Sequence, residues 1–190
     1  MGILVLVPTE HERSLLPPGA DAEVCGFGLA AAGAGAAHAI ALHRPDRVVL
    51  VGAAGTLRPD TVPVGAAVVG SAVRCDGIGV GSGPGRLSAA QLGWAASDEF
   101  ALDGDQGVIL SVAAASADPA EAKERAERHE DAVLEEMEGY AVAVAATLAG
   151  VPLTIIRGVS NIAGDRDAGS WRLKEALQAA HERLITMVPR

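Results

Sequence analysis

Short aliphatic segments that alternate with helix-like segments constrain the fold of this chain more than any other feature. Residues 3–7, 47–51, 108–112 and 153–159 consist mainly of Ile, Leu and Val. Segments this short and apolar are typical of strands buried on both faces of a parallel sheet. Further strands are expected over residues 24–28, 64–73 and 131–134, and helices over 9–16, 29–43, from 118 onward, 137–148 and 170–187. The alternation predicts an α/β fold with a mostly parallel central sheet covered by helices on both faces.

The core of this fold has to be built from small aliphatic side chains. Of the 190 residues, 49% are hydrophobic but only 3% are aromatic, and the chain contains 38 Ala and 23 Gly. This length fits one domain with a single core, and no linker or internal repeat divides residues 1–190. The formal net charge of −9 argues against nucleic acid as a partner, because phosphate binding requires a basic surface.

The sequence suggests neither export nor a membrane span. Residues 1–5 lack the basic segment of a signal peptide. The longest stretch without formal charge, residues 24–43, has the length of a span, but its glycines and histidines favour a buried strand and helix. Cys25 and Cys75 lie far apart and show no CxxC spacing. We therefore expect a cytoplasmic protein without a disulfide framework.

The sequence matches the dinucleotide-binding pattern only in part and does not match the spacing of metal ligands. Residues 26–31 match the G-x-G-x-x-A pattern of dinucleotide-binding folds, but Asp46 precedes the next strand, whereas a ribose-binding acid should follow it. Close packing of helix on sheet is the preferred interpretation. The five histidines show no metal-ligand spacing, and no serine stands in a G-x-S-x-G motif. The sequence thus predicts neither a metal nor an organic cofactor.

Polar residues that follow strands are the best candidates for chemistry, because ligands bind at the carboxyl ends of strands in such sheets. Residues 52–55, Gly-Ala-Ala-Gly, predict a turn whose backbone a ligand can approach closely. Residues 135–138 place three glutamates at the start of an apolar helix, where the helix dipole alone favours one or two. Residues 157–161 end an apolar strand with polar groups. Two polar clusters on either side of one helix suit a polyhydroxylated ligand.

At these residues the chain resembles the nucleoside phosphorylase and nucleosidase superfamily. The segments 136–139 (Glu-Met-Glu-Gly) and 157–161 (Arg-Gly-Val-Ser-Asn) are similar to its ribose-binding and base-binding motifs, and Glu12 and residues 52–55 agree in order. Residues 160–171 resemble the futalosine hydrolase branch of the superfamily. The resemblance implies a three-layer α/β/α fold of the nucleoside phosphorylase type and a homodimer or larger homo-oligomer. It also implies hydrolysis of futalosine to hypoxanthine and dehypoxanthine futalosine in menaquinone biosynthesis, without metal or organic cofactor.

The resemblance gives three residues catalytic roles. A ribosyl N-glycosidic bond breaks through an oxocarbenium-like cation, in analogy to glycoside hydrolysis. Glu12 is predicted to orient and deprotonate water, although its spacing from Thr9 also fits a capping box. Glu138 is predicted to accept the ribose hydroxyl protons and to stabilise the cation, or else only to complement the helix dipole. Asn161 is the third residue, and the other predicted substrate contacts are Gly52, Ala53, Ala54, Gly55, Val112, Ala113, Met137 and Ser160.

Asn161 bears on which purine leaves. Methylthioadenosine nucleosidases carry an aspartate at the matching position, and an amide cannot act as a general acid. An amide does donate a hydrogen bond to the acceptor atoms of hypoxanthine, whereas a carboxylate would be repelled by O6. Asn161 therefore favours a 6-oxopurine, unless it serves only the loop. Leu50 and Val51 stand where phosphorylases of the superfamily carry a phosphate-binding arginine, so water is the predicted nucleophile.

Supporting roles are expected for the neighbouring charged residues. Arg157 lies inside a strand and is expected to pair with a structural carboxylate, and Glu136 to support the site. Trp171 and the loop 165–167 are expected to brace the pocket, with the loop charges paired among themselves.

A dinucleotide-binding oxidoreductase stays open as the third alternative, and two other functions precede it. One is a methylthioadenosine or adenosylhomocysteine nucleosidase, which releases adenine. The other is a non-catalytic nucleoside-binding protein, because the glycine-rich residues 76–106 predict a flexible loop where part of a pocket would be missing.

Overall fold

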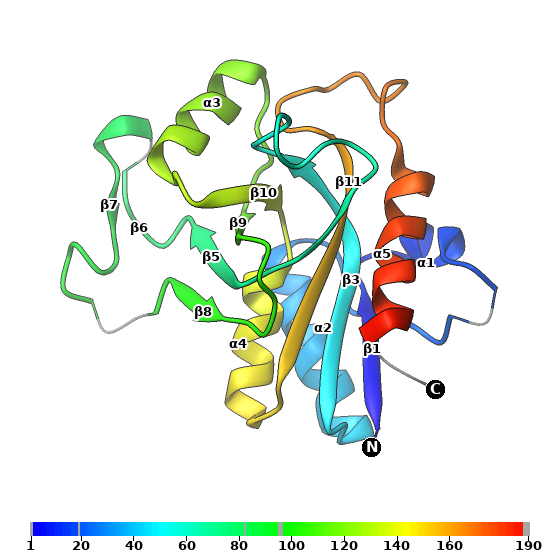
Figure 1. Ribbon diagram of the computed structural model, residues 1–190. Coiled ribbons are helices and arrows are strands. Elements are labelled where there is room, and N and C mark those ends of the chain that lie inside the picture. Colours follow the sequence, from blue (N-terminus) through cyan, green and yellow to red (C-terminus); the bar gives the residue numbers. More distant parts are fainter. Residues whose placement is uncertain (1, 19, 82, 95–96, 188–190) are drawn as a thin grey trace.

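The structure is a computed structural model that describes residues 2–18, 20–81, 83–94 and 97–187 (Figure 1). Its helices are α1 (Glu10–Leu15), α2 (Gly28–His43), α3 (Pro119–Arg128), α4 (Gly139–Ala149) and α5 (Leu173–Met187). A short 3-10 turn spans Gly83–Gly85. The strands are β1 (Ile3–Val7), β2 (Glu23–Val24), β3 (Arg47–Thr56), β4 (Ala67–Val69), β5 (Ala72–Asp76), β6 (Gly79–Val80), β7 (Leu87–Ser88), β8 (Glu99–Ala101), β9 (Val108–Val112), β10 (Ala132–Glu136) and β11 (Leu153–Ile162).

A mixed central sheet organises the molecule. Within the described residues it has nine strands, with the order β2-β1-β3-β10-β9-β5-β8, while β11 pairs with β3 and β4. The pairs β1–β2, β1–β3, β3–β11, β9–β10 and β5–β9 are parallel. The pairs β3–β10, β4–β11 and β5–β8 are antiparallel. The predicted α/β fold with a mostly parallel sheet is confirmed.

Helices cover the sheet from opposite sides (Figure 1). Helices α2 and α4 pack against each other on one side, and α5 packs on β3 and β11 and contacts α1 on the other. Small residues permit these close approaches: a Cβ at Gly35 of α2 would overlap the backbone carbonyl of Cys25. Close packing, the interpretation preferred from the sequence, accounts for Gly35 and for Gly26, whose Cβ would approach Ala31 at 2.9 Å, but not for Gly28, whose Cβ would meet no atom within 4 Å. Asp46 accepts a hydrogen bond from the Gly2 amide at 2.7 Å.

Two strands extend beyond their predicted ends. Strand β3 continues to Thr56, so residues 52–55 lie in a strand and the predicted turn is wrong. Strand β11 continues to Ile162, and the two remain paired as far as Ile162 opposite Thr56, with one bulge after Val159. This long-range pairing holds the small residues extended, whereas their composition by itself resembles a turn.

Three other predicted elements differ in detail. The single strand predicted over 64–73 is two strands, β4 and β5, because β4 pairs with β11 while β5 pairs with β9. The predicted loop 76–106 contains the β6–β7 ladder and β8. Helix α5 begins at Leu173, three residues after its predicted start at 170, and the hydroxyl of Ser170 donates to Asp165 at 2.7 Å. No helix in the described part of the chain is both long enough and apolar enough to cross a bilayer.

Candidate active site

A cavity of about 300 Å³ lies where β1, β3, β10 and β11 end. Its lining includes all three residues predicted to be catalytic, Glu12, Glu138 and Asn161. Five of the predicted substrate contacts line it as well, namely Ala53, Ala54, Gly55, Met137 and Ser160. Four chain segments that are distant in the sequence thus meet around one space, as expected for the strand ends of such a sheet.

Glu12 is buried at the start of α1, and its carboxylate is held by two hydrogen bonds. Thr9 is the N-cap of α1 and accepts from the Glu12 amide at 3.1 Å. The Glu12 carboxylate does not return to the Thr9 backbone amide, as it would in a capping box; Oε2 accepts from the Thr9 hydroxyl at 2.7 Å and Oε1 from the Ala53 amide at 3.0 Å. The cap therefore accounts for the helix start, and the Ala53 amide of β3 fixes the carboxylate at the cavity.

Arg157 forms a buried ion pair with Glu136, which lines the cavity. Glu136 pairs with Arg157, accepts from the hydroxyl of Ser111, and accepts from the amides of Glu138 and Gly139 at 2.8–3.0 Å. Its carboxylate thus caps the start of α4 and is fully engaged by the protein. The expected pairing of Arg157 with a structural carboxylate is confirmed.

Gly52 makes room for this pair. A Cβ at Gly52 would overlap Nη1 of Arg157, so the glycine in β3 is required by close approach of the guanidinium. Gly52 lies opposite Arg157 in the β3–β11 ladder. It faces the arginine and lies outside the cavity lining, contrary to its predicted substrate contact.

Glu138 has fewer partners than Glu136. Its Oε1 accepts from the Gly28 amide at 2.9 Å, and its Oε2 lies 3.2 Å from Nη2 of Arg157. Burial raises the pKa of Glu138 from 4.5 to about 7; Arg157 opposes this rise and the neighbouring Glu136 adds to it. One arginine shared by two carboxylates leaves Glu138 poorly neutralised, and its oxygens retain acceptor capacity toward the cavity.

The Asn161 side chain has a fixed orientation at the end of β11. Its Oδ1 accepts from the Ser160 hydroxyl at 2.8 Å, and its Nδ2 donates to the carbonyl of Ile162 at 2.9 Å. The Ile162 carbonyl, which can only accept, assigns the amide nitrogen and therefore places the amide oxygen toward Ser160. Because an amide nitrogen carries two hydrogens, one remains for a ligand in the cavity.

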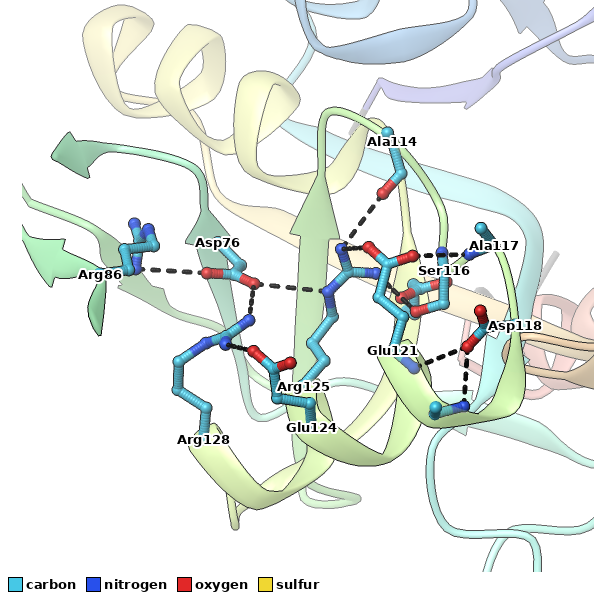
Figure 2. Close-up of polar contacts among 12 residues, drawn as sticks. Asp76, Arg86, Ala114, Ser116, Ala117, Asp118, Glu121, Glu124, Arg125 and Arg128 are labelled. Atoms are coloured by element: carbon cyan, nitrogen blue, oxygen red, sulfur yellow. Dashed lines mark hydrogen bonds and ion pairs between the residues drawn. The ribbon is translucent and has the colours of Figure 1, made fainter. Parts of the chain in front are cut away.

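The far wall of the cavity is held by a second buried arginine. Arg125 of α3 pairs with Glu135 of β10, and the Glu135 carboxylate accepts from the amide and the hydroxyl of Ser116 at 2.8 and 2.6 Å. Figure 2 shows the Arg125 guanidinium between Asp76 on one side and Ser116 and Glu121 on the other. This network anchors the loop that carries Ala115, which lines the cavity.

The loop between β11 and α5 forms part of the rim. Trp171 donates its indole N–H to the carbonyl of Asp165 at 3.1 Å, and the guanidinium carbon of Arg166 lies 5.2 Å from the centre of the Trp171 ring. Both Arg166 and Trp171 line the cavity. Asp165 and Asp167 accept from donors within the loop, and no ion pair joins either to Arg166 among the described residues. The expectation that the loop charges pair among themselves is wrong.

Two further predicted contacts lie outside the cavity lining. Val112 is fully buried in the core around Leu110, and Ala113 is exposed. The chain reaches the cavity two residues later, at Ala115, because the loop is drawn toward Glu135 by Ser116. Lining residues outside the predicted catalytic residues and substrate contacts include Pro8, Thr9, His11, Phe27, Ala115, Glu135 and Leu173. Glu135 had a signal, since it precedes two predicted site glutamates at a strand end. Thr9, His11 and Ala115 had a weaker one, since each follows a predicted strand, whereas Phe27 had none.

Within the described residues, no group of three or more histidine, cysteine, aspartate or glutamate side chains is arranged to hold a metal ion. The polar side chains that line the cavity are those of Thr9, His11, four glutamates, Ser160, Asn161, Arg166 and Trp171.

The chain belongs to the phosphorylase superfamily, whose family model matches residues 22–189. Within the superfamily it belongs to the futalosine hydrolase family. It is 34% identical to the futalosine hydrolase of Streptomyces coelicolor over an alignment that covers 92% of this chain and 80% of that protein.

Solved structures share the fold. A 5′-methylthioadenosine/S-adenosylhomocysteine nucleosidase from Colwellia psychrerythraea, in complex with adenine, superposes with a TM-score of 0.79 and 21% identity, covering 98% of this chain and 94% of that chain. The native futalosine hydrolase of Helicobacter pylori superposes with a TM-score of 0.77 and 16% identity, covering 97% of this chain and 96% of that chain. At these identities the similarity establishes the fold alone.

Proposed function

We propose that this protein is a futalosine hydrolase, which cleaves the N-glycosidic bond of futalosine with water and releases hypoxanthine and dehypoxanthine futalosine. The reaction would be a step of menaquinone biosynthesis, carried out in the cytoplasm. The observation that carries the proposal is the meeting of Glu12, Glu138 and Asn161 around one cavity. The 34% identity to a futalosine hydrolase over most of the chain supports the choice of substrate.

Glu12 is the proposed general base. Its carboxylate is fixed by the Ala53 amide and the Thr9 hydroxyl, and no cation lies in ion-pair contact with it among the described residues. A carboxylate held in this way can orient a water molecule and accept its proton while the sugar becomes cationic. The attacking water would approach the anomeric carbon on the face opposite the purine.

Glu138 is the proposed ribose ligand. Its ionised carboxylate can accept hydrogen bonds from two ribose hydroxyl groups and stabilise the adjacent oxocarbenium-like charge. The full engagement of Glu136 by Arg157, Ser111 and the start of α4 leaves Glu138 as the better placed of the two carboxylates. Met137, between them in the chain, lines the cavity and would pack against the sugar.

Asn161 is the proposed partner of the leaving purine. Its free amide hydrogen suits the O6 or N7 acceptor of a 6-oxopurine, and it would stabilise the charge that develops there as the bond breaks. The Ile162 carbonyl opposes a flip of the amide, because it can only accept a hydrogen bond. A carboxylate at this position would repel O6, which disfavours a 6-oxopurine.

The test compares two nucleosides as substrates. Purified protein is incubated separately with futalosine and with methylthioadenosine, and free bases are quantified by chromatography. We expect hypoxanthine from futalosine and little adenine from methylthioadenosine. Release of adenine without hypoxanthine would identify the protein as an adenine-specific nucleosidase, and release of neither base would favour a non-catalytic binding protein.

A pair of glutamine variants on α1 tests the base. Glu12→Gln should lower kcat by about 10²- to 10⁴-fold, the usual contribution of a general base. Glu10→Gln is the matched control, because Glu10 is exposed and pairs with Arg13 at 2.7 Å. Its kcat should stay within about twofold of the parent value, as is usual for an exposed pair. Equal rates for Glu12→Gln and the parent would remove Glu12 from the mechanism.

We further propose that the protein works as a homodimer or larger homo-oligomer. An apolar groove of about 450 Å³ lies between α2 and α4, and Leu148 at its edge is 84% exposed. A second copy seated on this groove would remove apolar surface from water. Sedimentation should show a dimer or larger species, and Leu148→Glu should shift it toward monomer. A monomeric parent protein at micromolar concentration would contradict this assembly.

A further inference from the structure

Arg166 is a cation at the cavity rim without a carboxylate partner among the described residues. It lines the cavity, and its guanidinium carbon lies 5.2 Å from the centre of the Trp171 ring. The neighbouring acids are occupied elsewhere: Asp165 accepts from the hydroxyl of Ser170 and the amide of Asp167, and Asp167 accepts from the amide of Gly169. The guanidinium is thus oriented by an aromatic face while its N–H groups stay available.

The cavity as a whole repels anions. Four glutamates line it, at positions 12, 135, 136 and 138, and two buried arginines, Arg125 and Arg157, pair with three of them. A ligand that brings its own carboxylate into this space meets unfavourable charge unless a cation compensates it. Arg166 is the rim residue that can supply that compensation.

We propose that Arg166, oriented by Trp171, is the subsite for the carboxylate of the substrate and selects purine nucleosides whose 5′ extension ends in an aryl carboxylate. This inference rests on the proposed function, because futalosine carries a carboxyphenyl group on that side of its ribose. An arginine fork binds a carboxylate through two parallel N–H donors, and its face stacks on an aromatic ring at the same time. The Trp171 ring also offers an apolar surface to the phenyl group.

The first experiment varies the charge of the residue and of the substrate together. kcat and KM are measured for the parent and for Arg166→Gln, with futalosine and with its neutral methyl ester. A lost charged hydrogen bond of about 1.5–3 kcal/mol predicts a fall in kcat/KM for futalosine of about 10- to 100-fold, mainly through KM. The ester should lose less than about threefold. An equal loss for both substrates would overturn the subsite, because Arg166 would then only balance the acidic cavity.

Arg172→Gln is the matched control. Arg172 lies at the end of the same loop, is exposed, and approaches Glu175 only at 3.7 Å, outside the cavity lining. Removal of its charge should change kcat/KM for futalosine by less than about twofold, as expected for an exposed pair. A loss equal to that of Arg166→Gln would assign the effect to general attraction of an anion by the loop, and would overturn a specific subsite.

A binding measurement separates this inference from the proposed hydrolysis. Calorimetric titration with futalosine compares Glu12→Gln with the Glu12→Gln/Arg166→Gln double variant, so that no turnover is needed. A rise in Kd of about 10-fold or more in the double variant supports the subsite even if the parent releases no hypoxanthine, in which case the proposed function alone fails. Equal Kd values in the two variants would overturn the subsite even if the parent is an active hydrolase.

Discussion

Two buried clusters of charged side chains lie in this small molecule. Acidic groups outnumber basic groups in one cluster, and basic groups outnumber acidic groups in the other. In the cavity cluster, Arg157 serves the two carboxylates of Glu136 and Glu138. In the Asp76 cluster, one carboxylate receives four basic side chains at 3.0–3.4 Å, those of Arg86, Arg125, Arg128 and His129. Figure 2 shows the three arginines around Asp76. Arg125 also pairs with Glu135, a residue of the cavity wall, so the two clusters stand on either side of the same strand end.

The balance of charge decides the direction of each pKa. Burial raises the pKa of Glu138 to about 7, and the single shared arginine does not overcome it. Burial acts in the same direction on Asp76, but its contacts with His129 and Arg128 outweigh it and hold the pKa of that carboxyl well below its ordinary value. An acid that is short of cations keeps acceptor capacity for a ligand, whereas an acid with several cations is committed to structure. The comparison therefore assigns Glu138 to ligand binding and Asp76 to the structural scaffold.

The largest expected effect is loss of stability on removal of Arg157. Arg157→Leu leaves Glu136 and Glu138 buried without a cation, and breaking a buried ion pair in this way costs about 3–5 kcal/mol. Urea unfolding at neutral pH, followed by circular dichroism, measures the loss. The matched control is Arg47→Leu, whose pair with Asp103 is partly exposed and should contribute less than about 1 kcal/mol. Similar losses of stability in both variants would contradict the claim that Arg157 neutralises two buried carboxylates.

Glu138→Gln should damage activity while preserving the fold. Glutamine keeps the shape but loses the negative charge that stabilises the sugar cation, so kcat/KM should fall by about 10²- to 10³-fold. In the parent, kcat/KM should rise with pH through about 7 as Glu138 ionises, and this limb should be absent in the variant. Retention of both the rate and the limb would exclude Glu138 as the ribose ligand.

Asp76→Asn should lower the stability of the protein while preserving its activity. It removes the carboxylate toward which four basic side chains converge, and we expect a loss of about 2–3 kcal/mol in the free energy of unfolding. The variant should hydrolyse its substrate within about threefold of the parent rate below its Tm, because Asp76 does not line the cavity. Urea unfolding and initial rates on the same preparation make the comparison. A large fall in rate with intact stability would place this cluster in the chemistry.

Local signals in the sequence predict one part of the site well. Thr9 caps α1 as its spacing from Glu12 predicts, since a helix start depends on neighbouring residues. Glu136 and Glu138 are brought to the cavity because they lie at a strand end before an apolar helix, a pattern that is also local. The roles of Glu12, Glu138 and Asn161 themselves stay predictions until the variants are measured.

Other parts of the site depend on contacts across the fold. Residues 52–55 resemble a turn by composition but are extended, because β11 pairs along them. Glycine at 52 is required by a guanidinium more than a hundred residues away in the chain. Ala115 and Phe27 reach the cavity through loops, and their positions follow from Ser116 bound to Glu135 and from the packing of α2. No periodicity or spacing encodes such long-range contacts.

The pH dependence of stability should distinguish the two clusters directly. For Glu138 the folded pKa lies above the unfolded one, so its contribution is fully present below about pH 4.5 and is lost as pH rises toward 7. For Asp76 the folded pKa is depressed, so its contribution is present above about pH 4 and is lost as pH falls further. For Glu138 the rise from 4.5 to about 7 corresponds to about 3 kcal/mol. The free energies of unfolding of the parent, Glu138→Gln and Asp76→Asn are measured across pH 3–8. Each variant should lack only the pH-dependent change in stability that belongs to its own substituted residue.

The smallest effect tests whether α3 serves only as a scaffold. Asp118 caps α3, with its carboxylate accepting from the amides of Ala120 and Glu121 at 2.9 Å. Loss of this cap in Asp118→Ala should cost about 1 kcal/mol of stability. Because Arg125 is held by Asp76 and Glu135 from both sides, the helix should keep its position and the hydrolytic rate should be unchanged. A fall in rate out of proportion to the fall in Tm would show that the start of α3 shapes the cavity. Arg125 and the start of α3 would then have to be counted with the cavity cluster rather than with the scaffold.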